Sequence, residues 1–269
     1  MVLGALSRRN LGGLPSEQNP AAGRSATNHP RPPKVMAIPN DFDFTIVLFL
    51  NKFVGKSRLL DGSVELISDT PLLNGCILFV AFLWLIWFRD KREESRIRLL
   101  TGGVAAVLAG VLSRISQFFL HFHVRPLYSP DLKLTWPIGV QWGTLGHWNS
   151  FPSDHASLGF ALATLIWIND RRLGAFALFW AAIANSARIY LGYHYPTDIL
   201  GGAALGIFIV ILSQRLPLPS VVYRLLVWER CAPPSFYAVA FIGSYLAGTL
   251  FADLQTIAYL VVHLLVLPH

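Results

Sequence analysis

Charged side chains are scarce in this sequence. Only 14% of its 269 residues are Asp, Glu, Lys or Arg, whereas 54% are hydrophobic. The mean hydropathy is +0.49. Soluble domains carry about 25% charged residues, so the composition excludes an ordinary soluble domain. The sequence therefore predicts a membrane protein, with the lipid bilayer as its surroundings.

Cysteine is also rare, since the chain has only Cys76 and Cys231. Cys76 falls in an apolar run and Cys231 beside a basic connection, so we expect no disulfide between them. Neither cysteine has a partner at the spacing of a metal motif. No metal site and no cofactor are predicted.

Acidic residues are outnumbered: 15 Asp and Glu stand against 22 Lys and Arg, giving a net charge of +7. A basic excess can indicate nucleic-acid binding. In so apolar a chain, cations at the ends of membrane spans that face anionic lipid explain the excess better. We therefore expect no nucleic acid among the partners.

Residues 1–40 differ from the rest, because they lack apolar periodicity and are rich in Pro, Ser, Asn and Arg. This composition predicts a disordered basic tail, followed by one membrane domain over 41–269. Segment 42–57 interrupts its apolar stretches with Asn51 and two lysines and is short for a crossing. An interfacial or re-entrant helix suits it better.

Six apolar runs predict an all-α, polytopic transmembrane bundle of about six spans. They cover 72–88, about 99–124, 155–168, 173–191, 199–213 and 236–250. Several are shorter than the ~20 residues of a perpendicular crossing, so we expect their polar ends to extend them. The apolar run 254–267 is either a seventh span or a surface helix.

Lysine and arginine are distributed unevenly among the connections. Connections 89–98, 170–172 and 214–230 contain ten of them, whereas 125–153 and 192–197 contain only Arg125 and Lys133. The first set is therefore predicted to be cytoplasmic. This makes the chain a multi-pass plasma (inner) membrane protein with 125–153 outside. The basic tail lies outside if 72–88 crosses first, and inside if 42–57 also spans.

The first motif is Phe-Pro-Ser-Asp-His, at 151–155, directly before an apolar run. Ser153 is well placed to cap the helix that follows, and a helix N-terminus favours an anion. His155 would then lie beside a phosphate bound there. Taken alone, the segment could equally be a capped helix with an incidental histidine.

The second motif is Arg188-x5-His194-x3-Asp198. His194 and Asp198 are four residues apart, so the carboxylate could accept a hydrogen bond from one ring nitrogen and orient the other as a nucleophile. Thr197 is expected to cap the next helix. Both motifs fall at the outer face of the predicted bundle. Together they bring two histidines, a carboxylate and cations to one place, as chemistry on a phosphate through a histidine nucleophile needs.

These residues resemble the type 2 phosphatidic acid phosphatase superfamily. Its motifs Lys-x6-Arg-Pro, Pro-Ser-Gly-His and Ser-Arg-x5-His-x3-Asp match, in order, residues 125–126, 152–155 and 187–198. The resemblance covers about 42–213, with the core motifs between 114 and 198. The run Ser-Phe-Pro-Ser-Asp-His-Ala looks most like the undecaprenyl-diphosphate phosphatase branch.

The resemblance implies a metal-free lipid phosphatase that works through a phosphohistidine. In this scheme His194 attacks phosphorus, Asp198 orients the His194 ring, and His155 protonates the leaving oxygen. The implied substrate is undecaprenyl diphosphate, with phosphatidate or phosphatidylglycerophosphate as alternatives. The residues assigned to the phosphate-binding cluster are Arg125, Ser153, Asp154 and Arg188.

One departure concerns the first motif, where Phe118 stands at the position of the lysine. Arg114 lies one turn earlier and His121 one turn later on about the same helix face. Either could replace the lysine. In the alternative, Arg114 makes a contact between helices and one phosphate ligand is missing.

The other departures are Asp154, which replaces glycine, and Ala187, which replaces the serine before Arg188. A carboxylate repels phosphate unless it is paired with a cation. We therefore expect Asp154 to hold Arg125 or Arg188 within the cluster.

Two other functions are alternatives to the phosphatase. A non-catalytic lipid-phosphate binder or transporter is favoured by Phe118, but binding alone needs no oriented nucleophile. A serine hydrolase using Ser153 lacks a nucleophile elbow.

The pattern Gly202-x3-Gly206 predicts close packing between helices.

Overall fold

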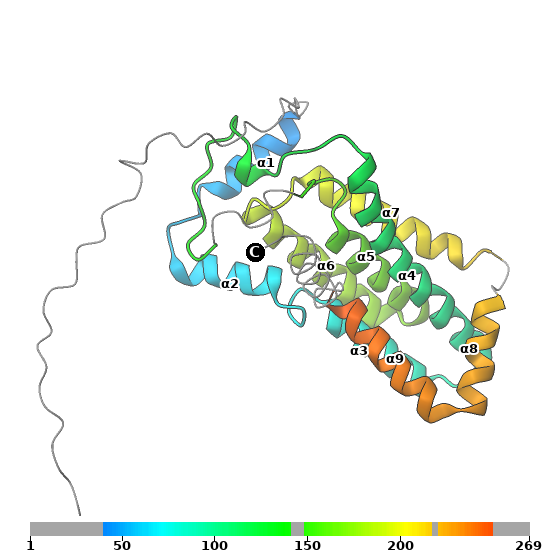
Figure 1. The fold of residues 1–269 in the computed structure, drawn as a ribbon. Coiled ribbons are helices and arrows are strands. Elements are labelled where there is room, and N and C mark those ends of the chain that lie inside the picture. Colours follow the sequence, from blue (N-terminus) through cyan, green and yellow to red (C-terminus); the bar gives the residue numbers. More distant parts are fainter. Residues whose placement is uncertain (1–39, 141–147, 217–219, 250–269) are drawn as a thin grey trace, which may run out of the picture. The chain divides into compact units, whose positions relative to one another are not determined.

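The computed structural model describes residues 40–140, 148–216 and 220–249. Within these ranges the chain forms nine α-helices and one short 3-10 helix, with no strand (Figure 1). The all-α class is therefore confirmed. Residues 1–39 and the run 254–267 lie outside the described residues, so the predictions made for them stay predictions.

Six of the helices coincide with the six predicted spans. They are α3 (Cys76–Arg89), α4 (Glu93–Phe119), α5 (Asp154–Asn169), α6 (Arg171–Tyr190), α7 (Pro196–Ser213) and α9 (Pro233–Gly248). By length and composition α4, α6 and α7 each suffice to cross a membrane, and α3 is a shorter apolar helix. The fold is a polytopic transmembrane helical bundle, as predicted.

Three further helices are present, of which only the one in segment 42–57 was expected, as an interfacial or re-entrant helix. Segment 42–57 contains α1 (Asp41–Asn51), which at 11 residues is too short to cross a bilayer. It is followed by α2 (Arg58–Asp69), and the basic connection after α7 contains α8 (Ser220–Cys231). All three are short elements beside the spans.

Helices α1 and α2 are joined to the region of the second motif by buried carboxylates. Asp43 of α1 accepts hydrogen bonds from the backbone N–H and the hydroxyl of Thr197, at the start of α7. Asp61 of α2 accepts a hydrogen bond from the Tyr190 hydroxyl at the end of α6. These contacts hold both short helices against the ends of the spans.

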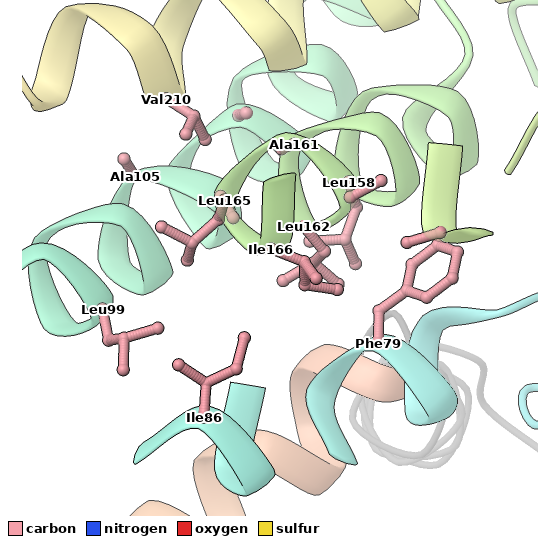
Figure 2. Packing of buried hydrophobic residues seen from close by; sticks show 14 of the residues in the cluster. Phe79, Ile86, Leu99, Ala105, Leu158, Ala161, Leu162, Leu165, Ile166 and Val210 are labelled. Atoms are coloured by element: carbon pink, nitrogen blue, oxygen red, sulfur yellow. The ribbon is translucent and has the colours of Figure 1, made fainter. Parts of the chain in front are cut away.

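Helix α5 is the centre of the bundle, since it packs against α3, α4, α6 and α7. Figure 2 shows Leu162 and Ile166 of α5 facing Phe79 and Ile86 of α3. All four side chains are buried. A helix surrounded on all sides holds its first turn in a fixed position, and that turn carries the first motif.

The predicted close packing at Gly202-x3-Gly206 is confirmed. A Cβ atom at Gly202 would lie 2.3 Å from the Ser153 carbonyl oxygen, and one at Gly206 would lie 2.1 Å from that of Ser157. Only glycine allows the α5 and α7 backbones to approach this closely. The beginnings of the two motif-bearing helices are therefore in contact.

The predicted cytoplasmic connections also meet one another in the structure. The end of α3 is linked to the start of α6 by the ion pair Arg89–Asp170. The start of α4 is linked to α8 by Arg230–Glu93 at 2.7 Å and by Arg96–Glu229 at 3.0 Å. The basic connections thus gather at the end of the spans opposite the two motifs.

Candidate active site

The two motifs meet through the backbone at the start of α5. Ser153 is the N-cap residue, as predicted, and its side chain accepts a hydrogen bond from the Ala156 N–H. The Ser153 N–H in turn donates to the Asp198 carbonyl at 3.1 Å. One hydrogen bond therefore joins the first turns of α5 and α7.

His194 lies in the turn between α6 and α7 and is only 1% exposed. Its Nδ1 is 2.9 Å from the carbonyl oxygen of Ser150, and its Nε2 is 3.2 Å from a guanidinium nitrogen of Arg125. A proton on Nδ1 can therefore be donated to Ser150, which leaves the lone pair on Nε2 beside a cation.

The direct hydrogen bond expected from the His194 ring to the Asp198 carboxylate is absent between these two described residues. The nearest approach, between Nδ1 and a carboxylate oxygen, is 3.7 Å. The Ser150 carbonyl is the closer partner, so it fixes the orientation of the ring. The reason is that α7 begins at Pro196, so His194 precedes the helix and helical spacing does not apply to it.

The environment of His194 keeps its imidazole neutral. Burial, with the nearby positive charge of Arg125, lowers the pKa of His194 to about 4. The neutral ring is the form with a free lone pair at neutral pH. An unprotonated, oriented imidazole is the form that nucleophilic catalysis requires.

Asp198 is fully buried and held by three hydrogen bonds. Its carboxylate accepts from the Ser150 hydroxyl, from the Tyr195 N–H at 2.7 Å and from Nδ1 of His123 at 3.2 Å. Tyr195 is the N-cap of α7, so the prediction that Thr197 caps this helix was wrong. The carboxylate is fixed because Asp198 is the third residue of α7 and accepts a hydrogen bond from the backbone N–H of the N-cap residue.

Ser150 and His123 were not predicted as site residues. Ser150 contacts both His194 and Asp198. The ring of His123 contacts Asp198 and also packs against Tyr195, with centroids 4.9 Å apart. Their only signal in the sequence is closeness to a motif: Ser150 directly precedes Phe151, and His123 lies two residues before Arg125.

Arg125 is buried beside His194. Its guanidinium donates to the backbone carbonyls of Tyr193 at 2.7 Å and Asn149 at 3.3 Å. Burial, with the nearby charge of Arg188, lowers the pKa of Arg125 to about 10, so it stays positive at neutral pH. A cation fixed at this position can bind the oxygens of a phosphate group that lies beside Nε2 of His194.

Arg188, at the end of α6, is also buried. Its guanidinium contacts α2, donating to the carbonyl and hydroxyl of Ser68 at 3.3 Å and lying 3.6 Å from Asp69. It is close enough to His155 to interact electrostatically. Helix α2, which was not predicted, therefore borders the candidate site.

Asp154 contacts neither Arg125 nor Arg188 at ion-pair distance, contrary to the expectation from sequence. Its carboxylate pairs with Arg114 of α4 at 3.1 Å and with Nδ1 of His155 at 3.0 Å. The alternative in which Arg114 makes a contact between helices is the one that the structure contains.

Two positions of the first motif remain: Phe118, which stands at the position of the lysine, and His121, the other candidate to replace it. Phe118 is 70% exposed, and its ring contacts Trp148. His121 is exposed, and its backbone carbonyl accepts a hydrogen bond from Asn149. Among the described residues, no group of three His, Cys, Asp or Glu side chains could hold a metal ion.

A buried imidazole beside arginines at the ends of membrane helices is the arrangement expected of a membrane phosphatase. Comparison with known families agrees, since the model of the PAP2 superfamily matches residues 103–220. The putative undecaprenyl-diphosphatase YbjG of Escherichia coli is 40% identical over 154 residues, covering 56% of this chain and 67% of that protein.

Two other relatives point the same way. The undecaprenyl-diphosphatase BcrC of Bacillus subtilis is 24% identical over 159 residues, covering 59% of this chain and 76% of that protein. The lipid A 4'-phosphatase of Porphyromonas gingivalis is 30% identical over 169 residues, covering 60% of this chain and 68% of that protein. The chain belongs to the PAP2 superfamily and is a membrane lipid phosphatase.

Proposed function

We propose that the protein hydrolyses undecaprenyl diphosphate to undecaprenyl phosphate and inorganic phosphate. The observation that carries the chemistry is the buried His194, with Nδ1 beside the Ser150 carbonyl and Nε2 beside Arg125. The names of the Escherichia coli and Bacillus subtilis relatives support this substrate.

In the first step, the Nε2 lone pair of His194 attacks the terminal phosphorus. The bond from phosphorus to the bridging oxygen breaks, and His155 donates a proton to that oxygen as it leaves. The charge on the phosphoryl oxygens is met by Arg125, by Arg188 and by the amides at the start of α5, which Ser153 caps. Fixed donors of this kind stabilise the transition state without reorganising.

In the second step, water attacks the phosphorus of phosphohistidine 194. His155, now neutral, takes a proton from that water. The bond between phosphorus and Nε2 breaks, inorganic phosphate leaves, and His155 is again protonated. The same residue therefore acts as acid and then as base.

We also propose that the site faces the non-cytoplasmic side of the membrane. The arginine-rich connections gather at the other end of the spans, where ion pairs such as Arg89–Asp170 join them. Basic connections are retained in the cytoplasm. The end that holds His194 would then open outward, where a polyprenyl headgroup can enter.

A second substrate class is favoured by the lipid A 4'-phosphatase relative, which covers a similar share of the chain. A phosphate monoester on a saccharolipid would use the same nucleophile and arginines. Phosphatidate and phosphatidylglycerophosphate would also fit this chemistry. The non-catalytic binder is disfavoured because the Bacillus subtilis and Escherichia coli relatives are named as diphosphatases.

Phosphate release by the purified full chain, measured over a panel of lipids, tests the substrate. The panel contains undecaprenyl diphosphate, undecaprenyl phosphate, phosphatidate, phosphatidylglycerophosphate and lipid A. We expect the highest kcat/KM for undecaprenyl diphosphate, and a loss on the order of 10³-fold or more for His194→Ala. Tenfold preference for another lipid would refute the substrate, and turnover by His194→Ala would refute the nucleophile.

A further inference from the structure

We infer that Asp154 is a positioning residue, which couples the Arg114 guanidinium of α4 to the imidazole of His155. The role rests on the proposed function, because it assumes that His155 transfers the proton. It gives one physical account of two departures from the family pattern: a carboxylate where the motif has glycine, and an arginine one turn before the missing lysine.

The contacts of Asp154 use both of its carboxylate oxygens. Oδ1 accepts from the backbone N–H of His155 at 2.8 Å and lies 3.0 Å from its Nδ1. Oδ2 accepts from Nη1 of Arg114 at 3.1 Å. The carboxylate is therefore placed between a cation and the ring, and its charge is balanced before any phosphate binds.

The contact with Nδ1 selects one tautomer of His155. A ring that donates Nδ1–H to Asp154 has Nε2 as the nitrogen that exchanges a proton with substrate. A carboxylate on Nδ1 also favours the protonated imidazolium that the first step needs. Glycine, the family residue at position 154, can do neither.

The charged groups around His155 come from several elements. Arg188 of α6 and Asp69 of α2 are near enough to interact with it electrostatically. Arg114 of α4 reaches the ring through the carboxylate. Asp154 is the one anion in hydrogen-bond contact with His155 among the described residues.

Arg114 is held in place by a second contact. Its guanidinium lies 4.1 Å from the centroid of the Trp148 ring, and its side chain is only 24% exposed. A partly buried carboxylate needs such a fixed cation, since burying one charge without its partner is costly. Asp154 and Arg114 therefore form a functional pair, while Phe118 at the lysine position is exposed.

The test compares two substrates in single turnover, with enzyme in excess, so that only release of the leaving group is measured. One substrate is an alkyl phosphate monoester, whose alkoxide is a poor leaving group. The other is an aryl phosphate, whose phenolate leaves without much protonation. For Asp154→Asn we expect the rate of leaving-group release to fall about 10²-fold on the alkyl substrate, and less than about threefold on the aryl substrate.

A general decrease in activity would affect both substrates alike, so an equal loss overturns the positioning role. The matched control is Arg96→Gln, which breaks an inter-helix ion pair of the same kind, Arg96–Glu229 at 3.0 Å, at the opposite end of α4. We expect this variant to leave the ratio of the rate on the alkyl substrate to the rate on the aryl substrate unchanged. A changed ratio also overturns the inference.

Arg114 is tested by a double-mutant cycle on the alkyl substrate. If Arg114 acts through Asp154, Arg114→Gln lowers the rate about tenfold in the natural chain and less than about twofold in Asp154→Asn. Arg114→Lys, which keeps the charge, restores part of the rate. Equal losses in both backgrounds, with a raised KM, would mean that Arg114 binds phosphate directly and would overturn the coupling.

Failure of the proposed function is distinguishable from failure of this inference. If His194→Ala retains turnover, the phosphohistidine scheme fails whatever Asp154 does. If His194→Ala is inactive and Asp154→Asn loses both substrates equally, the scheme stands and the positioning role alone is wrong.

Discussion

At the scale of single residues, Asp198 is linked to the proposed nucleophile, His194, through Ser150. The Ser150 hydroxyl donates to the Asp198 carboxylate, and the Ser150 carbonyl lies 2.9 Å from Nδ1 of His194. Removing the carboxylate would therefore release Ser150 as well as remove a negative charge 3.7 Å from the ring.

The motif residues could be predicted from the sequence, but their partners could not. Spacing suggested a hydrogen bond from His194 to Asp198. The separation of 3.7 Å is too long for one, because His194 lies before the first residue of α7. Asp154 was expected to pair with the arginines of the motifs, whereas its partner Arg114 comes from α4. Sequence order does not show which cation faces a carboxylate across two helices.

At the scale of helices, the sequence predicted the spans well and the short helices poorly. The six apolar runs correspond to six helices because continuous hydrophobicity over a bilayer thickness leaves few alternatives to a helix. In α2, by contrast, charged and polar residues alternate with apolar ones over only 12 residues. Such a helix depends on tertiary contacts, here the buried Asp61 and the pair between Arg188 and Asp69.

The contact between α5 and α7 gives a prediction for Gly202→Ala. The new methyl group would lie 2.3 Å from the Ser153 carbonyl, so the backbone at the start of α5 must move. We expect a destabilisation of about 1–3 kcal/mol and a loss of about 10²-fold in kcat/KM, because small displacements misplace reacting groups. Thermal unfolding in detergent and phosphate release measure the two effects.

The control for this variant is Gly103→Ala in α4. A Cβ atom at Gly103 would meet nothing within 4 Å, and alanine favours a helix over glycine. We expect unchanged or slightly raised stability and unchanged activity. If Gly202→Ala behaves like Gly103→Ala, the close approach of α5 and α7 does not position the site.

At the scale of the whole molecule, the two ends of the spans differ in chemistry. One end gathers the basic connections and their ion pairs. The other gathers the candidate site, where the polar side chains Arg125, His194 and Asp198 are buried. The uneven distribution of Lys and Arg among the connections predicted which end of the spans is basic. The second end could be located only because two separate motifs fall on the same side of the membrane.

Cysteine labelling in intact cells tests the proposed orientation. Cys231 is exposed at the basic end and Cys76 is buried, so the chain carries its own internal control. Asp131 is an exposed residue in the loop after α4. We expect a membrane-impermeant maleimide to label Asp131→Cys before permeabilisation, and Cys231 only afterwards. Labelling in the reverse order would place the site in the cytoplasm.

The most direct measurement is to trap the phosphoenzyme and locate the phosphoryl group. Purified protein is mixed with undecaprenyl diphosphate carrying a radioactive terminal phosphate, quenched within one turnover in alkali, and digested for mass spectrometry. We predict label on His194 that survives alkali and is lost in acid, and no label in His194→Ala. Label on Ser153, or full turnover with no labelled protein at any time, would contradict nucleophilic attack by His194.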